Sequence, residues 1–261
     1  MRLSIVTAVL NSHEIVRRQI LHYKKIGLPS ADAEIIYVDD GSEIPIKTVE
    51  NADRITILET HDKRPWTQPK ARNMGVKHAS GDYLMLMDLD HIINMESISI
   101  LLNTDVDLIR FKRYAGVLDE NGDFIQDEKT LKAYGLRGRY LKDLFRLPAH
   151  GNTFAIKREL YIKLGGVSER YCGTGTYPNR EEVPFKRIIN PMVESGQTSY
   201  IGDDNRPSIY MIPNGKYCGD GNDKDYNPFG LFHTLNRNGR KVIFKKVGRN
   251  ESERTFCNNP G

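Results

Sequence analysis

Cysteine is scarce in this sequence: only Cys172, Cys218 and Cys257 occur in 261 residues, odd in number and far apart. This spacing excludes a disulfide scaffold and a Cys-x-x-Cys zinc site, so we expect a reducing, cytoplasmic environment. Long apolar runs are also absent, since no stretch approaches the roughly 18 residues that a membrane helix needs. The apolar segment 3–10 turns polar without a cleavage-site pattern. We therefore expect neither an integral membrane segment nor a secreted precursor, with peripheral contact to a membrane left open.

Two common nucleotide-binding signatures are missing as well. No Gly-x-Gly-x-x-Gly follows the first apolar segment, which argues against a dinucleotide dehydrogenase, and no Gly-x4-Gly-Lys-Ser/Thr occurs, which argues against a P-loop kinase. The composition that remains is 39% hydrophobic and 28% charged, with a formal net charge of +4. Such a composition predicts a folded chain with a substantial core.

The positive charge is concentrated near one end of the sequence. Residues 237–254 hold seven Lys or Arg against two Glu, a net charge of +5, which leaves −1 for the rest of the chain. A basic segment of this kind is either a solvated face or a surface that meets a polyanion such as nucleic acid, a phosphorylated glycan or a lipid-phosphate surface.

Apolar and amphipathic segments alternate through the first hundred residues. Four short, β-rich apolar segments predict buried strands: 3–10, 35–38, 55–58 and 83–87. Two segments with helical spacing lie between them, one capped by Ser12 and ended by Gly27 and Pro29, the other opened by Pro69 and ended by Gly81. This alternation predicts an α/β fold with a mainly parallel central sheet flanked by helices, whose ligands bind beyond the carboxyl ends of the strands.

The pattern changes after residue 100. Segment 108–111 predicts a strand, and 117–125 predicts a hairpin that turns at Asn121-Gly122. Residues 126–148 show no firm period. Segment 151–156 predicts another strand, followed by a short helix over 157–164 that Gly165-Gly166 ends, and 181–193 predicts a further helix.

One acidic motif has the setting of a metal site. Asp88-Leu89-Asp90 directly follows the apolar strand 83–87, so its two carboxylates emerge at the ligand-binding edge of the sheet. Alternate residues of an extended segment point the same way, and two hard oxygen ligands suit Mg²⁺ or Mn²⁺. Two further Asp-x-Asp pairs, at 105/107 and 223/225, lack this setting and are read as surface turns.

Several motifs in order resemble the GT-A-fold glycosyltransferases, closest to family 2. They are Ser4–Ala8, Val38–Ser42, Ala71–Tyr83, Asp88–Asp90, Gly151–Glu159 and Leu164–Arg170. The resemblance covers roughly residues 1–195. It implies a GT-A fold and a metal-dependent, inverting transfer of a sugar from a nucleotide-diphosphate sugar to a hydroxyl, as hexosyl or pentosyl transfer. We expect a single domain over 1–261, with a nucleotide-sugar half (1–100), an acceptor half (101–236) and a basic tail (237–261).

The resemblance also assigns roles on the donor side. Asp39 or Asp40 would accept hydrogen bonds from the base or ribose, and Arg72, with Lys70, would lie near the diphosphate. Asp88 would serve both donor and metal. The expected donor-binding residues are Thr7, Ala8, Asp39, Asp40, Lys70, Arg72 and Asp88. Trp66, the only tryptophan, lies in a loop that either covers the donor or packs structurally.

The acceptor side needs a base, because an acceptor hydroxyl is a poor nucleophile until a carboxylate takes its proton. By the resemblance the base is Glu182 or its neighbour Glu181, with Glu182 preferred. His233 is the expected third metal ligand after Asp88 and Asp90, and His150 is a weaker candidate for contact with the acceptor.

Two alternatives stay open at this point. A sugar nucleotidyltransferase shares the nucleotide-binding α/β half, although its Gly-rich N-terminal loop is replaced here by Val9–His13. A nucleotide- or sugar-binding relative without catalytic activity is compatible with the altered Glu181-Glu182 region. The acceptor itself is not identified by the sequence; a glycan, a lipid phosphate and a hydroxylated DNA base all fit a polyanion.

Overall fold

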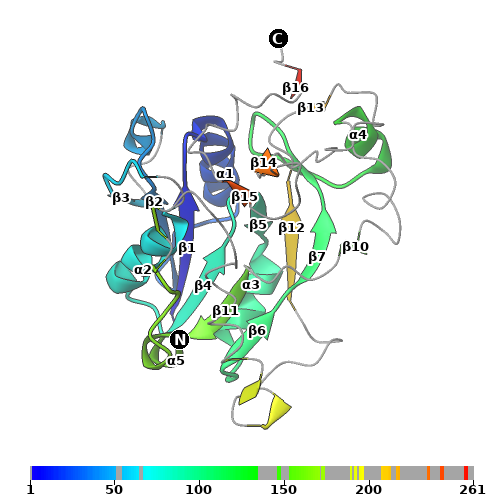
Figure 1. The fold of residues 1–261 in the computed structure, drawn as a ribbon. Coiled ribbons are helices and arrows are strands. Elements are labelled where there is room, and N and C mark those ends of the chain that lie inside the picture. Colours follow the sequence, from blue (N-terminus) through cyan, green and yellow to red (C-terminus); the bar gives the residue numbers. More distant parts are fainter. Residues whose placement is uncertain are drawn as a thin grey trace.

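The computed structural model describes residues 2–50, 55–64, 67–134, 153–170, 172–173, 189, 191–192, 194–196 and 207–212, together with two-residue strands at 146–147, 216–217, 234–235, 242–243 and 256–257 (Figure 1). None of the helices within these ranges combines the length and the apolar character needed to cross a bilayer.

The central sheet has six strands in the order β3-β2-β1-β4-β11-β6. Their bounds are β1 Leu3–Val9, β2 Ala33–Asp39, β3 Thr56–Glu59, β4 Tyr83–Met87, β6 Leu108–Arg110 and β11 Phe154–Lys157. β1 to β4 pair in parallel, whereas β11 runs antiparallel to both of its neighbours. The predicted α/β class with a mainly parallel sheet is confirmed, and every predicted strand up to residue 111 is present.

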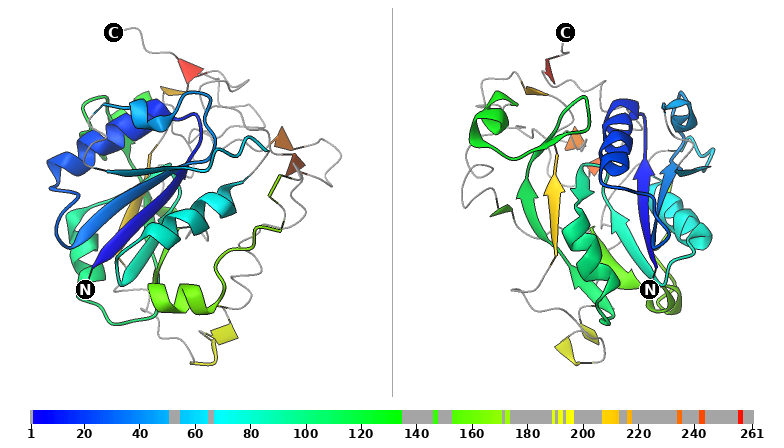
Figure 2. Two further views of the ribbon diagram at one scale, coloured as in Figure 1. Left: turned by 90° about the vertical axis from the view of Figure 1, so that its left-hand side faces the viewer. Right: turned by 180° about the vertical axis from the view of Figure 1, so that it is seen from behind.

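Helices cover both faces of this sheet (Figure 2). Side chains of α1 (His13–Lys25) and α3 (Met95–Leu102) pack into one apolar cluster, and those of α2 (Gln68–His78) and α5 (Arg158–Lys163) pack into the other. Residues alternate along β1: Ile5 and Val9 face the first cluster, and Val6 faces the second. This double coverage explains why the parallel strands are apolar without alternation in the sequence.

Helix α2 packs closely on the sheet at Gly75. A Cβ on Gly75 would overlap the Val6 side chain and reach 3.0 Å from Cγ2 of Val38. Only glycine therefore fits this point of the helix, despite its cost of about 1 kcal/mol relative to alanine. The close approach brings the first turns of α2 to the carboxyl ends of β1, β2 and β4.

The structure contains a second, four-stranded sheet, which the sequence did not predict. Its order is β10-β7-β12-β5, with bounds Arg146–Leu147, Lys112–Ala115, Ser208–Met211 and His91–Ile93. β12 pairs antiparallel with β5 and parallel with β7. β12 pairs with two strands that lie about a hundred residues earlier in the chain, so no local pattern in the sequence marks the sheet.

The smaller elements complete the described chain. The predicted hairpin is confirmed as β8 (Val117–Leu118) paired with β9 (Phe124–Ile125), with Gly122 at φ +79°. A 3₁₀ helix covers Ile46–Thr48, and α4 covers Glu128–Ala133, where we expected no regular structure. The remaining pairs are β13 (Lys216–Tyr217) with β16 (Phe256–Cys257) and β14 (Thr234–Leu235) with β15 (Val242–Ile243).

Candidate functional site

The site lies where the direction of strand order reverses. From β1, the chain adds β2 and β3 on one side, and then β4 on the other side. In open α/β sheets, ligands bind in the crevice outside the carboxyl ends of the strands at such a reversal. The two acidic motifs of the sequence lie there, since Asp39 ends β2 and Asp88 directly follows β4.

The turn at Asp88–His91 is called here the second acidic turn, because the turn after β2 comes earlier in the chain. A glutamine of α1 holds its backbone. Gln19 donates through Nε2 to the carbonyl oxygens of Leu89 (2.6 Å) and His91 (3.0 Å). Its Oε1 accepts a hydrogen bond from the Tyr37 hydroxyl at 2.7 Å. All these contacts are buried, so the backbone of the turn is held by a fully engaged side chain in a low-dielectric core.

Two other elements hold the same turn from its flanks. The backbone N–H of Asp88 donates to Oγ1 of Thr153, just before β11, at 3.1 Å. The backbone N–H of Ile212, just after β12, donates to the Asp90 carbonyl oxygen at 2.8 Å. Supports from α1, β11 and β12 therefore meet at one turn, which is the arrangement needed for a preorganised site.

The side chains of this turn form a cluster with metal-ligand chemistry. One ligand atom each from Asp88, Asp90 and His91 lie within 4.8 Å of one another, and all three residues are buried. His91 Nδ1 is 3.1 Å from Oδ1 of Asp90. Two carboxylates and an imidazole suit Mn²⁺, and carboxylates alone suit Mg²⁺. The donor set therefore fits the divalent metal that the sequence motif predicts.

His91 was missed at the level of sequence. His91 directly follows Asp88-Leu89-Asp90, and this adjacency is the signal that could have found it; the sequence analysis predicts His233 as the third ligand instead. His233 lies outside the described residues, as do Glu181, Glu182, His150 and Trp66. Their roles stay predictions.

Arg72 reaches into the same cluster from α2. Its side chain is fully buried, and Nη2 donates to Oδ1 of Asp88 at 2.6 Å. A buried carboxylate needs such a partner, because an uncompensated charge in the interior is costly. The structure thus brings Arg72 to the donor-side acid, and its predicted contact with a diphosphate remains untested.

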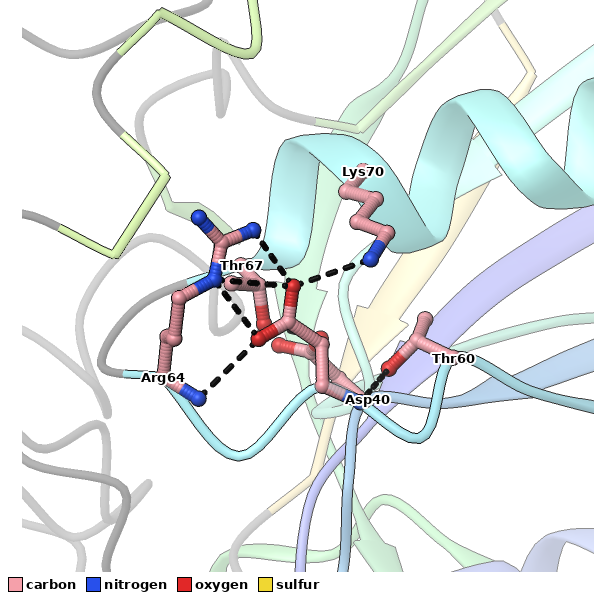
Figure 3. A network of polar contacts seen from close by, with 6 residues as sticks. Asp40, Thr60, Arg64, Thr67 and Lys70 are labelled. Carbon is pink, nitrogen blue, oxygen red and sulfur yellow. Dashed lines mark hydrogen bonds and ion pairs between the residues drawn. The ribbon is translucent and has the colours of Figure 1, made fainter.

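The turn after β2, called here the first acidic turn, contains Asp39 and Asp40, whose carboxylates have different partners. Oδ1 of Asp39 accepts from the backbone N–H of Ser42 (2.7 Å), and Oδ2 accepts from that of Ile46 (2.9 Å). The Asp40 carboxylate accepts instead from the hydroxyl of Thr67, at the start of α2 (Figure 3). Asp39 therefore shapes the loop, while Asp40 faces the side where α2 begins.

Lys70 belongs to a charged network beside Asp40 (Figure 3). Its Nζ is 2.9 Å from Oδ2 of Asp62, a buried carboxylate that also binds Arg64 at 2.7 Å and 3.0 Å. The Arg64 hydrogen bonds, followed by the bond from Lys70, hold the pKa of Asp62 well below its usual range. The network fixes a cationic edge next to the first acidic turn.

Thr7 and Ala8 lie in β1, between the two acidic turns. Thr7 pairs with Tyr37 on one side and Met87 on the other and is fully buried, and its hydroxyl has no hydrogen-bond partner among the described residues. Ala8 is half-buried beside the cluster that α2 covers. Their predicted contact with a base stays a prediction.

The fold and the site define a class of protein. A mainly parallel sheet with a reversal of strand order, and a buried acidic cluster at its carboxyl edge, are typical of α/β proteins that bind a ligand beyond the ends of their strands. The model of the family "Glycosyl transferase family 2" matches residues 4–165. The chain belongs to this family, as its motifs predicted.

Known proteins agree with this assignment. The chain is 25% identical over 168 residues to the poly(ribitol-phosphate) beta-N-acetylglucosaminyltransferase TarS of Staphylococcus aureus strain Mu50. These 168 residues are 62% of this chain and 26% of TarS. The match thus spans about a quarter of that relative's length. A crystal structure of S. aureus TarS 1-349 in complex with UDP covers 81% of this chain and 60% of its own, at 18% identity and a TM-score of 0.51.

A further solved structure has the same fold. The mannosyltransferase PcManGT from Pyrobaculum calidifontis, in complex with GDP-Man and Mn²⁺, is 15% identical, covers 84% of this chain and 58% of its own, and has a TM-score of 0.50. At this identity the similarity concerns the fold, and it confirms the predicted GT-A architecture.

Proposed function

We propose that this chain transfers a sugar from a nucleoside-diphosphate sugar to an acceptor hydroxyl, with inversion at the anomeric carbon. The observation that carries the proposal is the buried cluster of Asp88, Asp90 and His91 at the carboxyl edge of the sheet, where only β1 separates its strand β4 from β2 and the first acidic turn. Family membership supports the reaction class. The division into a donor half (1–100), an acceptor half (101–236) and a basic tail (237–261) is part of this proposal.

The donor side has residues suited to each part of a nucleotide sugar. Asp88, Asp90 and His91 would hold Mn²⁺ or Mg²⁺, and such an ion, when bound, neutralises charge on a diphosphate leaving group. Asp40 would accept a hydrogen bond from the base or the ribose, because its carboxylate accepts from the Thr67 hydroxyl on the side where α2 begins, whereas both carboxylate oxygens of Asp39 accept from backbone N–H groups of the loop. Lys70 lies at the cationic edge beside it.

The acceptor side supplies the proton acceptor. Glu182 takes the proton of the acceptor hydroxyl while the new bond from that oxygen to the anomeric carbon forms. The bond from the anomeric carbon to the diphosphate oxygen breaks on the opposite face, and the nucleoside diphosphate leaves with the bonding electrons. One displacement of this kind inverts the configuration at the anomeric carbon.

The acceptor is a hydroxyl-bearing polyanion in this proposal. The basic tail, with its net charge of +5 over residues 237–254, suits a phosphate-containing partner. The relative TarS acts, by its name, on poly(ribitol phosphate), which is a polymer of this chemistry. Poly(ribitol phosphate) is therefore the first acceptor to test, with a phosphorylated glycan and hydroxylated DNA as the other arms.

The direct test measures release of nucleoside diphosphate from UDP-GlcNAc and from GDP-mannose, with Mn²⁺, with each acceptor and with water alone. Glu182→Gln should lower kcat by about 10² to 10⁴ at nearly unchanged donor affinity, because the amide keeps the shape but takes no proton. Glu181→Gln is the matched control. Normal turnover in both variants would contradict the base assignment, and no consumption of any donor by the wild type would contradict the proposed function.

A further inference from the structure

Asn73, the residue after Arg72, joins α2 to a segment on the acceptor side of the chain. Its Oδ1 accepts from the Tyr161 hydroxyl (2.8 Å) and from the backbone N–H of Val167 (3.2 Å). Its Nδ2 donates to the Val167 carbonyl oxygen and to Oε1 of Glu169, both at 2.8 Å. An amide side chain has two acceptor and two donor positions, so every one of them is used here.

The partner segment is built to receive this side chain. Gly166 has φ +69°, a conformation that other residues rarely adopt. A Cβ on Gly166 would also lie 2.7 Å from Oδ1 of Asn73. The glycine is therefore needed both for its backbone conformation and for the approach of the Asn73 amide.

A second contact holds the other end of the same segment. A Cβ on Gly173 would lie 2.9 Å from Cδ of Arg64, so the Gly173 backbone packs directly on that side chain. Arg64 is in turn bound to Asp62, and Asp62 also binds Lys70 of α2. The described residues 166–170 are thus attached to the α2 region through Asn73, and residues 172–173 through Arg64, which binds Asp62.

The position of this segment links it to the reaction. In the sequence it leads directly toward Glu181 and Glu182, the residues assigned to proton transfer. Neighbouring residues of one helix therefore serve two parts of the site: Arg72 binds Asp88 of the second acidic turn, and Asn73 binds the segment that precedes the base. We propose that Asn73 is a positioning residue that sets the acceptor-side segment against the donor site; this rests on the proposed function.

The test separates positioning from donor binding and from stability. Asn73→Ala should lower kcat for nucleoside-diphosphate release at least tenfold, while the Kd for UDP or GDP in the presence of Mn²⁺ changes less than threefold. Lys77→Ala, on the exposed face of the same helix, is the matched control and should leave both unchanged. Tyr161→Phe, which removes one hydrogen bond to Asn73, should give a smaller loss of kcat and serves if Asn73→Ala does not fold.

A rescue experiment tests the geometry itself. Asn73→Asp keeps the two acceptor positions but sets a carboxylate against Glu169 and the Val167 carbonyl, so kcat should fall. Glu169→Gln in that background restores a donor toward residue 73 and should recover at least threefold of the lost kcat, although Glu169→Gln alone gains nothing.

Three outcomes overturn the inference. The first is an Asn73→Ala protein with a lower melting temperature but unchanged kcat, and the second is a Kd that rises in parallel with the loss of kcat. The third is an absence of rescue in the double variant. A wild type that consumes no nucleotide sugar would instead overturn the proposed function, and the inference with it.

Discussion

Two acidic turns lie at one edge of the central sheet, and each comes at the carboxyl end of a buried apolar strand. They differ in what their carboxylates contact. The first acidic turn follows β2, and the Asp39 side chain binds two backbone N–H groups of its own loop. The second acidic turn follows β4. There the Asp88 side chain binds the Arg72 guanidinium, and the Asp90 carboxylate lies against His91.

The difference shows where chemistry can be placed. A carboxylate that accepts from backbone amides is committed to the shape of its loop. In the second turn the backbone is held by Gln19, Thr153 and the end of β12, so the side chains do not have to hold the loop. A strand followed by acidic residues therefore predicts a site only when other parts of the chain hold the turn.

Of the variants that test this difference between the turns, Arg72→Met should lose the most unfolding free energy. Removing one partner of a buried ion pair leaves an uncompensated charge and typically costs about 3 to 5 kcal/mol of unfolding free energy. The pair is fully buried on the arginine side. Urea unfolding measures the loss, and Arg72→Lys, which keeps the charge, should lose less. A loss below about 1 kcal/mol would mean that Asp88 does not depend on Arg72.

The next effect separates the two acids of the first turn. Asp39→Asn should lower the unfolding free energy by about 1 to 3 kcal/mol, because an amide nitrogen then faces one of two backbone N–H groups, with nucleotide affinity little changed. Asp40→Asn should leave the unfolding free energy little changed and weaken UDP or GDP binding about tenfold. Urea unfolding and calorimetric titration of both variants check the pair. The opposite assignment of losses would show that Asp39 is the nucleotide ligand.

The smallest effect concerns Asp62, the acid beyond β3, and depends on pH. Arg64 and Lys70 hold its folded-state pKa below the unfolded value of about 3.9. The ionised carboxylate therefore stabilises the fold above that pH, and this contribution is lost as the pH falls through the lower folded-state pKa.

Asp62→Asn should accordingly lower the melting temperature by a few degrees or less near pH 7, since Arg64 is largely exposed and the pair is screened. The difference between the wild type and the variant should narrow as the pH is lowered from about 5 to about 2. A difference that stays constant over this range would mean that the charge of Asp62 contributes nothing.

Local patterns were sufficient for most of the central sheet. Runs such as 83–87 are apolar because both faces of the sheet are covered, and that is visible in a short window of sequence. Helix α3 was missed although its cap was present: Asn94 accepts from the backbone N–H of Ser97 at 3.0 Å. The second sheet could not be predicted, because β12 meets β5 from more than a hundred residues away.

In the site, too, some residues could be found from local sequence patterns and others could not. The acidic positions 39, 40, 88 and 90 could be found because they end apolar strands. The supports could not, since Gln19 and Thr153 contact a turn 65 to 72 residues away in the chain. The contact of Asn73 with the segment after α5 is of the same kind. Sequence order marks these four acidic positions, but it did not mark His91, and the tertiary contacts that hold the turn become visible only in the folded chain.

We propose that the second acidic turn, and not the first, binds the metal that supports nucleotide binding. Calorimetric titration of UDP and GDP into the wild type, with and without Mn²⁺, tests it directly when repeated with Asp90→Asn and with Asp39→Asn. We predict that Mn²⁺ strengthens binding at least about tenfold in the wild type and in Asp39→Asn, and has no effect in Asp90→Asn, whose fold is retained. An undiminished effect of Mn²⁺ in Asp90→Asn would show that the second acidic turn does not bind this metal.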